Sequence, residues 1–194
     1  MSRVEQVERN RDLVLAAARR VFLHRGYSGA TLDAIAQEAG FSKGVVYSQF
    51  AGKADMFLAL LERRIEARAE SNARLAAGLA GLDGLGTLLL ANARRSEEDA
   101  AWMRVLIEFR VLAAREPAVN ERYARLHART LDGFTEAIAT VLERGGVEPA
   151  MPPRALAELI FVLDAGTVLE RASGSTSLPV TALEDIVFRL VGRA

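Results

Sequence analysis

The sequence contains no cysteine, and histidine occurs only twice in its 194 residues. Without cysteine the chain has no disulfide, no catalytic thiol and no thiolate-ligated zinc, which fits a reducing compartment. The histidines and carboxylates show no metal-ligand spacing, and no glycine-rich phosphate loop is present. These absences disfavour an enzyme, and we expect neither a metal site nor a cofactor.

A long hydrophobic run is also missing. The first residues, MSRVEQVERNRD, contain no apolar stretch of the kind found in signal peptides. The most apolar segment, 155–169, is interrupted by Glu158 and Asp164. It is shorter than the roughly 18 apolar residues that a membrane span needs. The sequence therefore predicts a cytoplasmic protein that has no membrane partner.

The chain as a whole has no excess of either charge, because 25 basic residues balance 25 acidic ones. The distribution along the chain is uneven. Residues 1–53 hold eight arginines and lysines but only five acidic residues, so the remainder is net acidic. A basic end on an acidic body is typical of a protein that meets nucleic-acid phosphate at that end.

Helical periodicity is present almost everywhere. Hydrophobic residues make up 51% of the chain, enough for a substantial core, and no segment sustains the alternation of a strand. The glycines between 78 and 86 predict a loose connection. We predict an all-α fold with helices ending at Gly26 and then spanning about 31–40, 42–48, 54–77, 85–95, 98–115, 118–144, 154–172 and 180–192.

The segment 31–50 has the pattern of two short helices joined by a tight turn. Thr31 is a suitable N-cap, and Gly40 can adopt the positive φ that the turn requires. Ser42 is expected to cap the second helix. Val46 and Phe50 are four residues apart, so both point inward and hold that helix in place. A purely structural helix pair is the alternative interpretation.

The second helix of this pair is predicted to present its other side chains to DNA. A helix-turn-helix places the N-terminal residues of its second helix in the major groove. Lys43 can contact guanine acceptors or phosphate, and Gln49 can form hydrogen bonds with adenine. Tyr47 and Lys53 are better placed for phosphate contacts. The candidate DNA-binding residues are Thr31, Ser42, Lys43, Gly44, Val45, Tyr47, Ser48, Gln49 and Lys53. Arg3, Arg9 and Arg11 are expected to form a solvated tail, with minor-groove contact as the alternative.

These residues carry a resemblance to a known family. The chain resembles the N-terminal domain of the tetracycline-repressor (TetR) family over about residues 10–60, in the order and spacing of Arg25-Gly26-Tyr27, Ala30-Thr31, Ile35-Ala36, Ala39-Gly40-Phe41-Ser42-Lys43-Gly44, Tyr47, Phe50 and Lys53. The resemblance implies a nine-helix homodimer that binds a palindromic operator and releases it when a small molecule binds. Val45 and the run 47–49 depart from the usual family residues, so base preference is not transferred.

The resemblance and the helical pattern together imply two domains. Residues 1–53 would be a three-helix helix-turn-helix DNA-binding domain, and residues 54–194 a helical ligand-binding and dimerisation domain. The predicted helices at 154–172 and 180–192 are strongly apolar, and two such helices per chain would form a four-helix bundle across a two-fold axis. Packing within one monomer is the alternative. The candidate interface residues are Leu156, Leu159, Ile160, Leu163, Leu183, Ile186, Val187 and Leu190.

The helices between 85 and 144 are expected to enclose a pocket for an unknown small-molecule effector. Such sites combine apolar walls with a few polar groups. The candidate residues are Trp102, Met103, Phe109, Arg110, Tyr123, His127, Thr130, Phe134, Asp164 and Thr167. Each aromatic residue has core packing as its alternative, and Asp164 requires a partner inside its apolar helix. The predicted function is a ligand-responsive repressor of transcription. An activator and a ligand-free architectural DNA-binding protein remain open.

Overall fold

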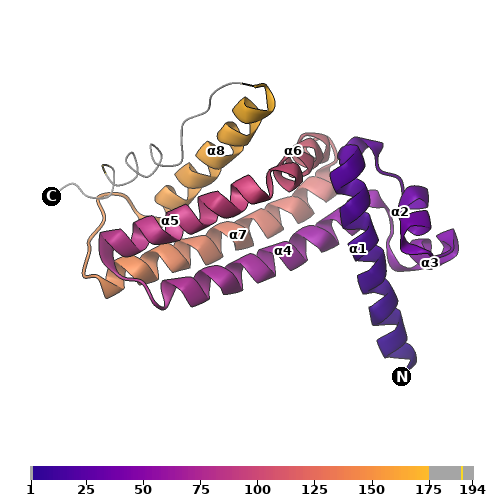
Figure 1. Ribbon diagram of the computed structural model, residues 1–194, viewed down its shortest axis with the longest axis horizontal. Coiled ribbons are helices and arrows are strands. Elements are labelled where there is room, and N and C mark those ends of the chain that lie inside the picture. Colours follow the sequence, from indigo (N-terminus) through magenta and orange to yellow (C-terminus); the bar gives the residue numbers. More distant parts are fainter. Residues whose placement is uncertain (1, 175–188, 190–194) are drawn as a thin grey trace. The chain divides into compact units, whose positions relative to one another are not determined.

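The computed structural model describes residues 2–174 and 189, and within them the chain forms eight α-helices and no strand (Figure 1). The helices are α1 (Arg3–Gly29), α2 (Leu32–Ala39), α3 (Lys43–Gln49), α4 (Lys53–Ala76), α5 (Gly81–Glu98), α6 (Ala100–Ala113), α7 (Pro117–Arg144) and α8 (Pro153–Ala172). The all-α prediction is confirmed. The predicted helix at 180–192 falls almost entirely outside the described residues. No helix in the described part of the chain has the length and apolar content of a bilayer-crossing segment.

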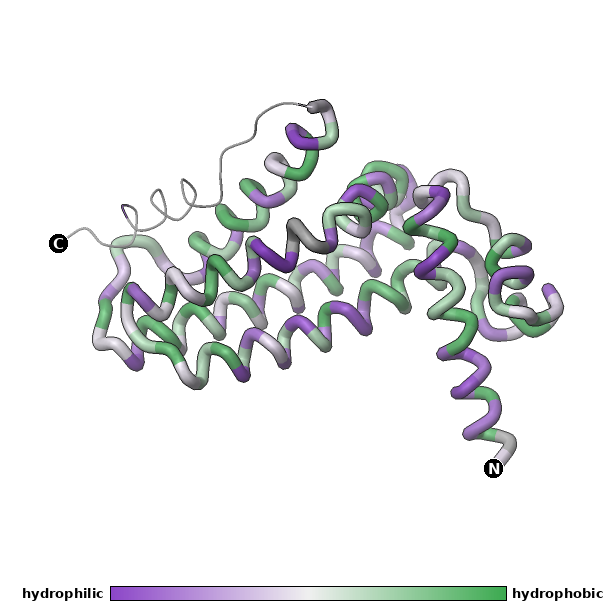
Figure 2. Tube along the Cα trace, in the orientation of Figure 1, coloured by the Kyte–Doolittle hydropathy of each residue, from purple (hydrophilic) through white to green (hydrophobic). Residues whose placement is uncertain are grey.

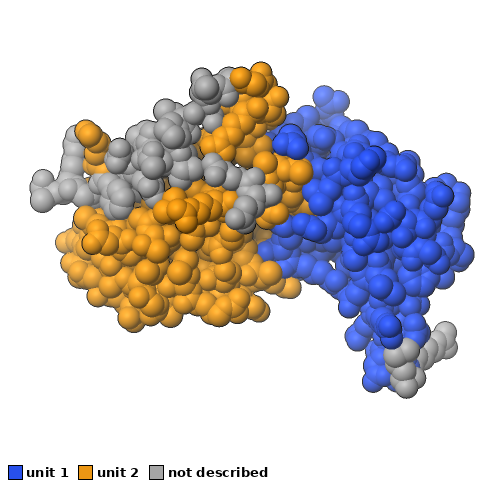
Figure 3. All heavy atoms as spheres, viewed as in Figure 1, with its two compact units in different colours: residues 1–64, 104–124 blue, residues 65–103, 125–194 orange. Residues whose placement is uncertain are grey.

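The chain divides into two compact units (Figure 3). Unit 1 comprises Met1–Arg64 and Arg104–Ala124, and unit 2 comprises Ile65–Met103 and Arg125–Ala194. The limits of the units fall inside α4, α6 and α7 rather than at a loop. A functional domain boundary after residue 53 therefore stays a prediction.

Helix α1 begins and ends where local sequence sets its limits. The Ser2 hydroxyl accepts from the Glu5 amide, and the Glu5 carboxylate accepts from the Ser2 amide, which together form a capping box. This box starts the helix at Arg3, so Arg9 and Arg11 belong to a helix rather than to a tail. Arg9 is exposed to solvent as predicted, whereas Arg11 is half-buried. Gly26, with φ 70° and ψ 173°, breaks the helix as predicted and leaves a short helical turn up to Gly29.

Five aromatic rings form the centre of unit 1. Phe57 lies 5.3 Å from Phe22, 5.4 Å from Tyr27 and 4.5 Å from Phe109, measured between ring centroids. Tyr123 extends the cluster, with its ring 6.0 Å from that of Phe109. The five rings come from α1, α4, α6 and α7, so this cluster ties the N-terminal helices to later parts of the chain.

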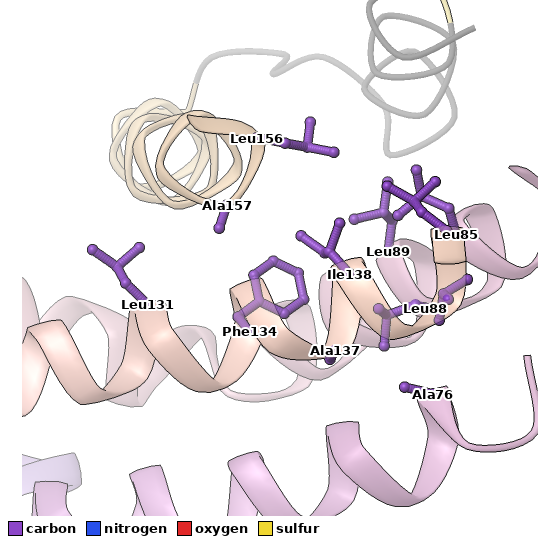
Figure 4. Close-up of a cluster of buried hydrophobic side chains, with 12 residues drawn as sticks. Ala76, Leu85, Leu88, Leu89, Leu131, Phe134, Ala137, Ile138, Leu156 and Ala157 are labelled. Atoms are coloured by element: carbon purple, nitrogen blue, oxygen red, sulfur yellow. The ribbon is translucent and has the colours of Figure 1, made fainter. Parts of the chain in front are cut away.

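In unit 2, the helices α4, α5, α7 and α8 share one hydrophobic core (Figure 4). Figure 2 shows apolar residues recurring at helical spacing along these helices. The core residues are Ala76, Leu85, Leu88, Leu89, Leu131, Phe134, Ala137, Ile138, Val141, Leu142, Leu156 and Ala157. The prediction of a loose connection up to residue 86 is wrong, because α5 already begins at Gly81. A Cβ on Gly84 would lie 3.0 Å from Val141 Cγ1, so glycine there permits close packing.

The aromatic cluster predicts a large effect of one core substitution. Phe57 is fully buried and contacts three other rings, so Phe57→Ala is expected to lower the free energy of unfolding by about 3–5 kcal/mol. Urea denaturation followed by circular dichroism measures this loss. Val111→Ala is the control, since Val111 is 57% exposed, and its effect should stay within about 0.5 kcal/mol. Equal losses in the two variants would contradict the assigned core.

Candidate DNA-binding site

Helix α2 and the turn that follows it have the predicted geometry. The Thr31 hydroxyl accepts from the Ala34 amide at 3.1 Å and so caps the helix. Gly40 ends the helix in the left-handed conformation, with φ 72°. The Phe41 amide donates to the Ala36 carbonyl at 3.0 Å, which closes the turn and sets the start of α3.

Helix α3 is held by its inner face and exposes its outer face, as predicted. Val46 is fully buried and Phe50 is 1% exposed, whereas Tyr47 is 57% exposed. Lys43, Gly44 and Ser48 are exposed as well, and Val45 is half-buried. Ser42 occupies the N-cap position, but its hydroxyl makes no capping hydrogen bond. The exposed part of α3 therefore centres on its N-terminal turn and Tyr47.

Lys43 is the basic side chain at the start of α3. Its Nζ makes a hydrogen bond and ion pair with Asp33 Oδ2 of α2, and this bond raises the pKa of Lys43. Both side chains are more than half exposed to solvent. An exposed pair of this kind contributes little to stability, so Lys43 can exchange Asp33 for another anion.

Gln49 does not adopt the predicted position. Its side chain is half-buried, and among the described residues its Oε1 has no hydrogen-bond partner. The Gln49 carbonyl accepts from Arg11 Nη1 at 3.0 Å, and the Arg11 guanidinium lies 4.3 Å from the centroid of the Phe50 ring. Arg11 thus fastens the C-terminal end of α3, and this arrangement does not support reading of adenine by Gln49.

Lys53 has a different role from the predicted phosphate contact. Its Nζ donates to the carbonyls of Tyr27 at 2.8 Å, Ser28 at 3.3 Å and Ala30 at 3.0 Å. An ammonium group has three donors, so these carbonyls engage all of them. Burial lowers the pKa of Lys53, and the negative charge of Glu108 acts in the opposite direction. Lys53 therefore holds the turn between α1 and α2.

The same turn is also held by Glu108 of α6, a contact that the sequence did not predict. Its Oε2 accepts from the amides of Tyr27 at 2.9 Å and Ser28 at 3.3 Å. A Cβ at Gly26 would lie 2.9 Å from both carboxylate oxygens, so glycine makes room for Glu108. Burial, with a smaller effect of Glu116, raises the pKa of Tyr27 to about 12. Glycine and tyrosine at 26 and 27 were visible in the sequence, but their partner lies 81 residues away.

The predicted effector residues fall into both units. Phe109, Arg110 and Tyr123 belong to unit 1, and the rest belong to unit 2. Phe109 and Tyr123 belong to the aromatic cluster of unit 1. For these two residues the structure therefore favours core packing, the alternative given above. The Arg110 guanidinium lies 5.5 Å from the centroid of the Tyr123 ring.

The candidates in unit 2 are partly core and partly helix-bound. Trp102 and Phe134 are buried, and Met103 is half-buried. The hydroxyls of Thr130 and Thr167 donate to carbonyls one turn earlier in their own helices. The His127 ring lies 6.0 Å from that of Phe161. Asp164 is half-buried and is not an isolated carboxylate. Within the described residues no three metal-ligating side chains come together.

The predicted interface residues on α8 divide between core and surface. Leu156 is fully buried in the core of unit 2, so it is not available to a partner. Ile160 packs partly against that core, while Leu159 and Leu163 are half-buried. Val162 is 69% exposed and Leu169 is 52% exposed, although neither was among the predicted interface residues. Leu183, Ile186, Val187 and Leu190 lie outside the described residues.

Two family models match this chain, one in its N-terminal third and one in the remainder. Residues 14–60 match the family model described as bacterial regulatory proteins, tetR family. Residues 81–194 match the model described as BetI-type transcriptional repressor, C-terminal. The second match alone covers more than half of the chain.

Curated relatives are regulators of transcription. The chain is 29% identical over 141 residues to the HTH-type transcriptional repressor AcnR of Corynebacterium diphtheriae. The matched region covers 72% of this chain and 66% of AcnR. The chain is 42% identical over 65 residues to the HTH-type transcriptional activator FasR of Mycolicibacterium smegmatis. That match covers 34% of this chain and 29% of FasR. The chain thus spans less than a third of FasR and about two thirds of AcnR.

Solved structures share the fold over nearly the whole length. Reduced NemR of E. coli has a TM-score of 0.72 at 19% identity and covers 94% of this chain and 97% of its own. FadR of Bacillus subtilis, crystallised with stearoyl-CoA, has a TM-score of 0.69 at 17% identity and covers 94% and 98%. The exposed helix α3, the two family matches and the shared fold agree. The chain belongs to the TetR family of bacterial transcriptional regulators.

Proposed function

We propose that this protein is a ligand-responsive repressor that binds a palindromic operator as a homodimer in the cytoplasm. The exposed face of α3 is the observation that supports this most directly. Lys43, Gly44 and Tyr47 face solvent, whereas Val46 and Phe50 fix the helix from below. A helix held in this way can enter the major groove without losing its own packing.

The proposed contacts follow from the exposed groups. Lys43 exchanges Asp33 for a guanine or a phosphate, and Tyr47 donates its hydroxyl to a phosphate. Gly44 permits close approach of the backbone. Thr31 and Ser42 stand at the N-termini of α2 and α3, where the helix dipole favours phosphate. Gln49 and Lys53 act indirectly, by holding α3 and the turn before α2.

Repression is favoured over activation by the extent of the similarities. The repressor AcnR matches 72% of the chain, whereas the activator FasR matches only the N-terminal third. The C-terminal family model is also that of a repressor. An operator-binding repressor needs no catalytic group, so the proposal includes no enzyme activity.

The homodimer is supported by the surface of α8. Val162 and Leu169 are both more than half exposed, and the half-buried Leu159 precedes Val162 by nearly one turn. Apolar side chains gathered along one helix favour association with a second copy. Two-fold symmetry would set the two copies of α3 about 34 Å apart, one turn of DNA.

Effector control is supported by the way Glu108 meets the turn before α2. Its carboxylate, on α6, holds the amides of Tyr27 and Ser28, so a shift of α6 changes the support of the DNA-binding helices. A ligand causes such a shift only if it binds one arrangement more tightly. Moving the population from 1:99 to 99:1 needs about 5.5 kcal/mol of differential affinity.

The first prediction from the proposed function concerns operator recognition. Selection from a random duplex library is expected to recover a palindrome, and Tyr47→Ala should weaken binding to it by at least about tenfold. Fluorescence anisotropy with the recovered duplex measures the affinity. Val111→Ala serves as the control, because Val111 is equally exposed but lies on α6. Failure to enrich any palindrome, or full affinity in Tyr47→Ala, would refute the proposed function.

The second prediction concerns salt. Each phosphate contact releases counterions, so Lys43→Gln is expected to reduce the slope of log affinity against log salt by about 1 per half-site. Arg74→Gln removes the same charge from an exposed position on α4 in unit 2. It should leave the slope unchanged. If the two variants have the same slope, Lys43 does not contact phosphate.

The third prediction concerns the turn before α2. Glu108→Gln removes a charged acceptor of two backbone amides, and it is expected to lower the free energy of unfolding by about 1–2 kcal/mol. Operator affinity should fall as well, because α2 and α3 lose support. The measurements are urea denaturation and anisotropy, and Glu8→Gln is the control at an exposed site on α1. Wild-type stability and operator affinity in Glu108→Gln would show that this contact is dispensable.

A further inference from the structure

Unit 2 contains a polar cluster between α4 and α5 that the proposed function has not yet used. Asn72 is 3% exposed and Asn92 is 7% exposed, and they are the buried polar residues among those described. Asn92 Nδ2 donates to Asn72 Oδ1 at 3.1 Å and to the Leu88 carbonyl at 2.9 Å. The two amides therefore bridge the helices at the edge of the apolar core.

Two arginines converge on these amides. Arg95 Nη1 donates to Ser71 Oγ at 2.6 Å, and its Nη2 donates to Asn72 Oδ1 at 2.8 Å. Arg68 donates from Nε to Asn92 Oδ1 at 3.3 Å and from Nη2 to the Asn92 carbonyl at 3.2 Å. The cluster thus places two positive charges around one pair of buried asparagines.

The guanidinium of Arg95 is not neutralised inside this cluster. Its acceptors, a hydroxyl and an amide oxygen, carry no charge, and within the described part of the chain no carboxylate pairs with it. Its Nε is buried, and no side chain or backbone group among the described residues forms a hydrogen bond with it. Burying part of a cation and one of its donors costs free energy unless an anion pairs with the charge and accepts from the donor. Arginine prefers carboxylate and phosphate as such anions, because its planar fork matches their oxygens.

We propose that Arg95, together with Arg68, Ser71 and the two asparagines, binds the acidic group of a small molecule. This inference rests on the proposed function, since it names the chemical class of the effector: an organic acid or a phosphate ester. The Nε–H of Arg95 donates to the anion, and the asparagines keep the guanidinium in place. Leu88 and Ala76 lie one helical turn from Asn92 and Asn72 and belong to the apolar core, so the polar cluster borders directly on that core.

Anion binding to the free protein provides the test. The probes are benzoate, inorganic phosphate and neutral benzamide, titrated by calorimetry and thermal melting in chloride buffer of matched ionic strength. Benzoate and benzamide share a shape, so their difference reports the charge, and phosphate distinguishes a phosphate ligand from a carboxylate. At ten times its Kd, a bound anion should raise Tm by about 3–6 °C.

Matched variants assign the effect to Arg95. Arg95→Gln is expected to weaken anion binding at least tenfold, whereas Arg94→Gln removes the same charge from the neighbouring exposed residue and should bind normally. Asn72→Asp supplies a carboxylate next to Arg95 Nη2. It should raise Tm without any anion and abolish the response to anions. This third variant keeps the test valid if Arg95→Gln folds poorly.

The outcomes separate this inference from the proposed function. Operator binding without anion should be the same in wild type, Arg94→Gln and Arg95→Gln. If neither benzoate nor phosphate binds the wild type, or if Asn72→Asp responds to them like the wild type, the anion site is refuted. The proposal that the protein is a repressor is then tested independently by the operator measurements.

Discussion

The DNA-binding helices depend on one short turn that is held by two side chains of opposite charge. Gly26 interrupts α1, and any such break leaves backbone amides and carbonyls without helical partners. Glu108 accepts from the amides of this turn, and Lys53 donates to its carbonyls. Thr31 caps α2 directly after the turn. The direction of α2, and therefore that of α3, follows from two long-range contacts, one to α6 and one to α4.

The face of α3 that points to solvent is defined by what holds the opposite face. Val46 and Phe50 bury the inner side of the helix, and Arg11 fixes its last turn through the Gln49 carbonyl and the Phe50 ring. The basic and aromatic residues of the region consequently divide into two groups. Arg11 and Lys53 stabilise the platform, whereas Lys43 and Tyr47 remain available to a partner. Recognition side chains on a rigid platform lose less entropy on binding, which favours affinity.

Local rules predicted the local features of this fold. The helix periodicity, the Thr31 cap, the breaks at Gly26 and Gly40 and the inward side chains of α3 depend on neighbours within a few residues. Most of the errors arise from contacts with distant parts of the chain. Gln49 turns inward and Gly84 lies inside a helix because of how neighbouring helices pack. No periodicity connects Glu108 with Tyr27, so a single sequence carried no signal for that contact.

The same contact links recognition to regulation in the proposed mechanism. Helix α6 is continuous from unit 2, where it includes Trp102, to unit 1, where it includes Glu108 and Phe109. A helix keeps its backbone hydrogen bonds when it moves, so it shifts as a stiff element rather than bending residue by residue. A displacement of α6 by an effector would therefore reach the amides of Tyr27 and Ser28 through the Glu108 carboxylate. Because packed cores have few alternative arrangements, a small shift there favours a switch between two states over a graded response.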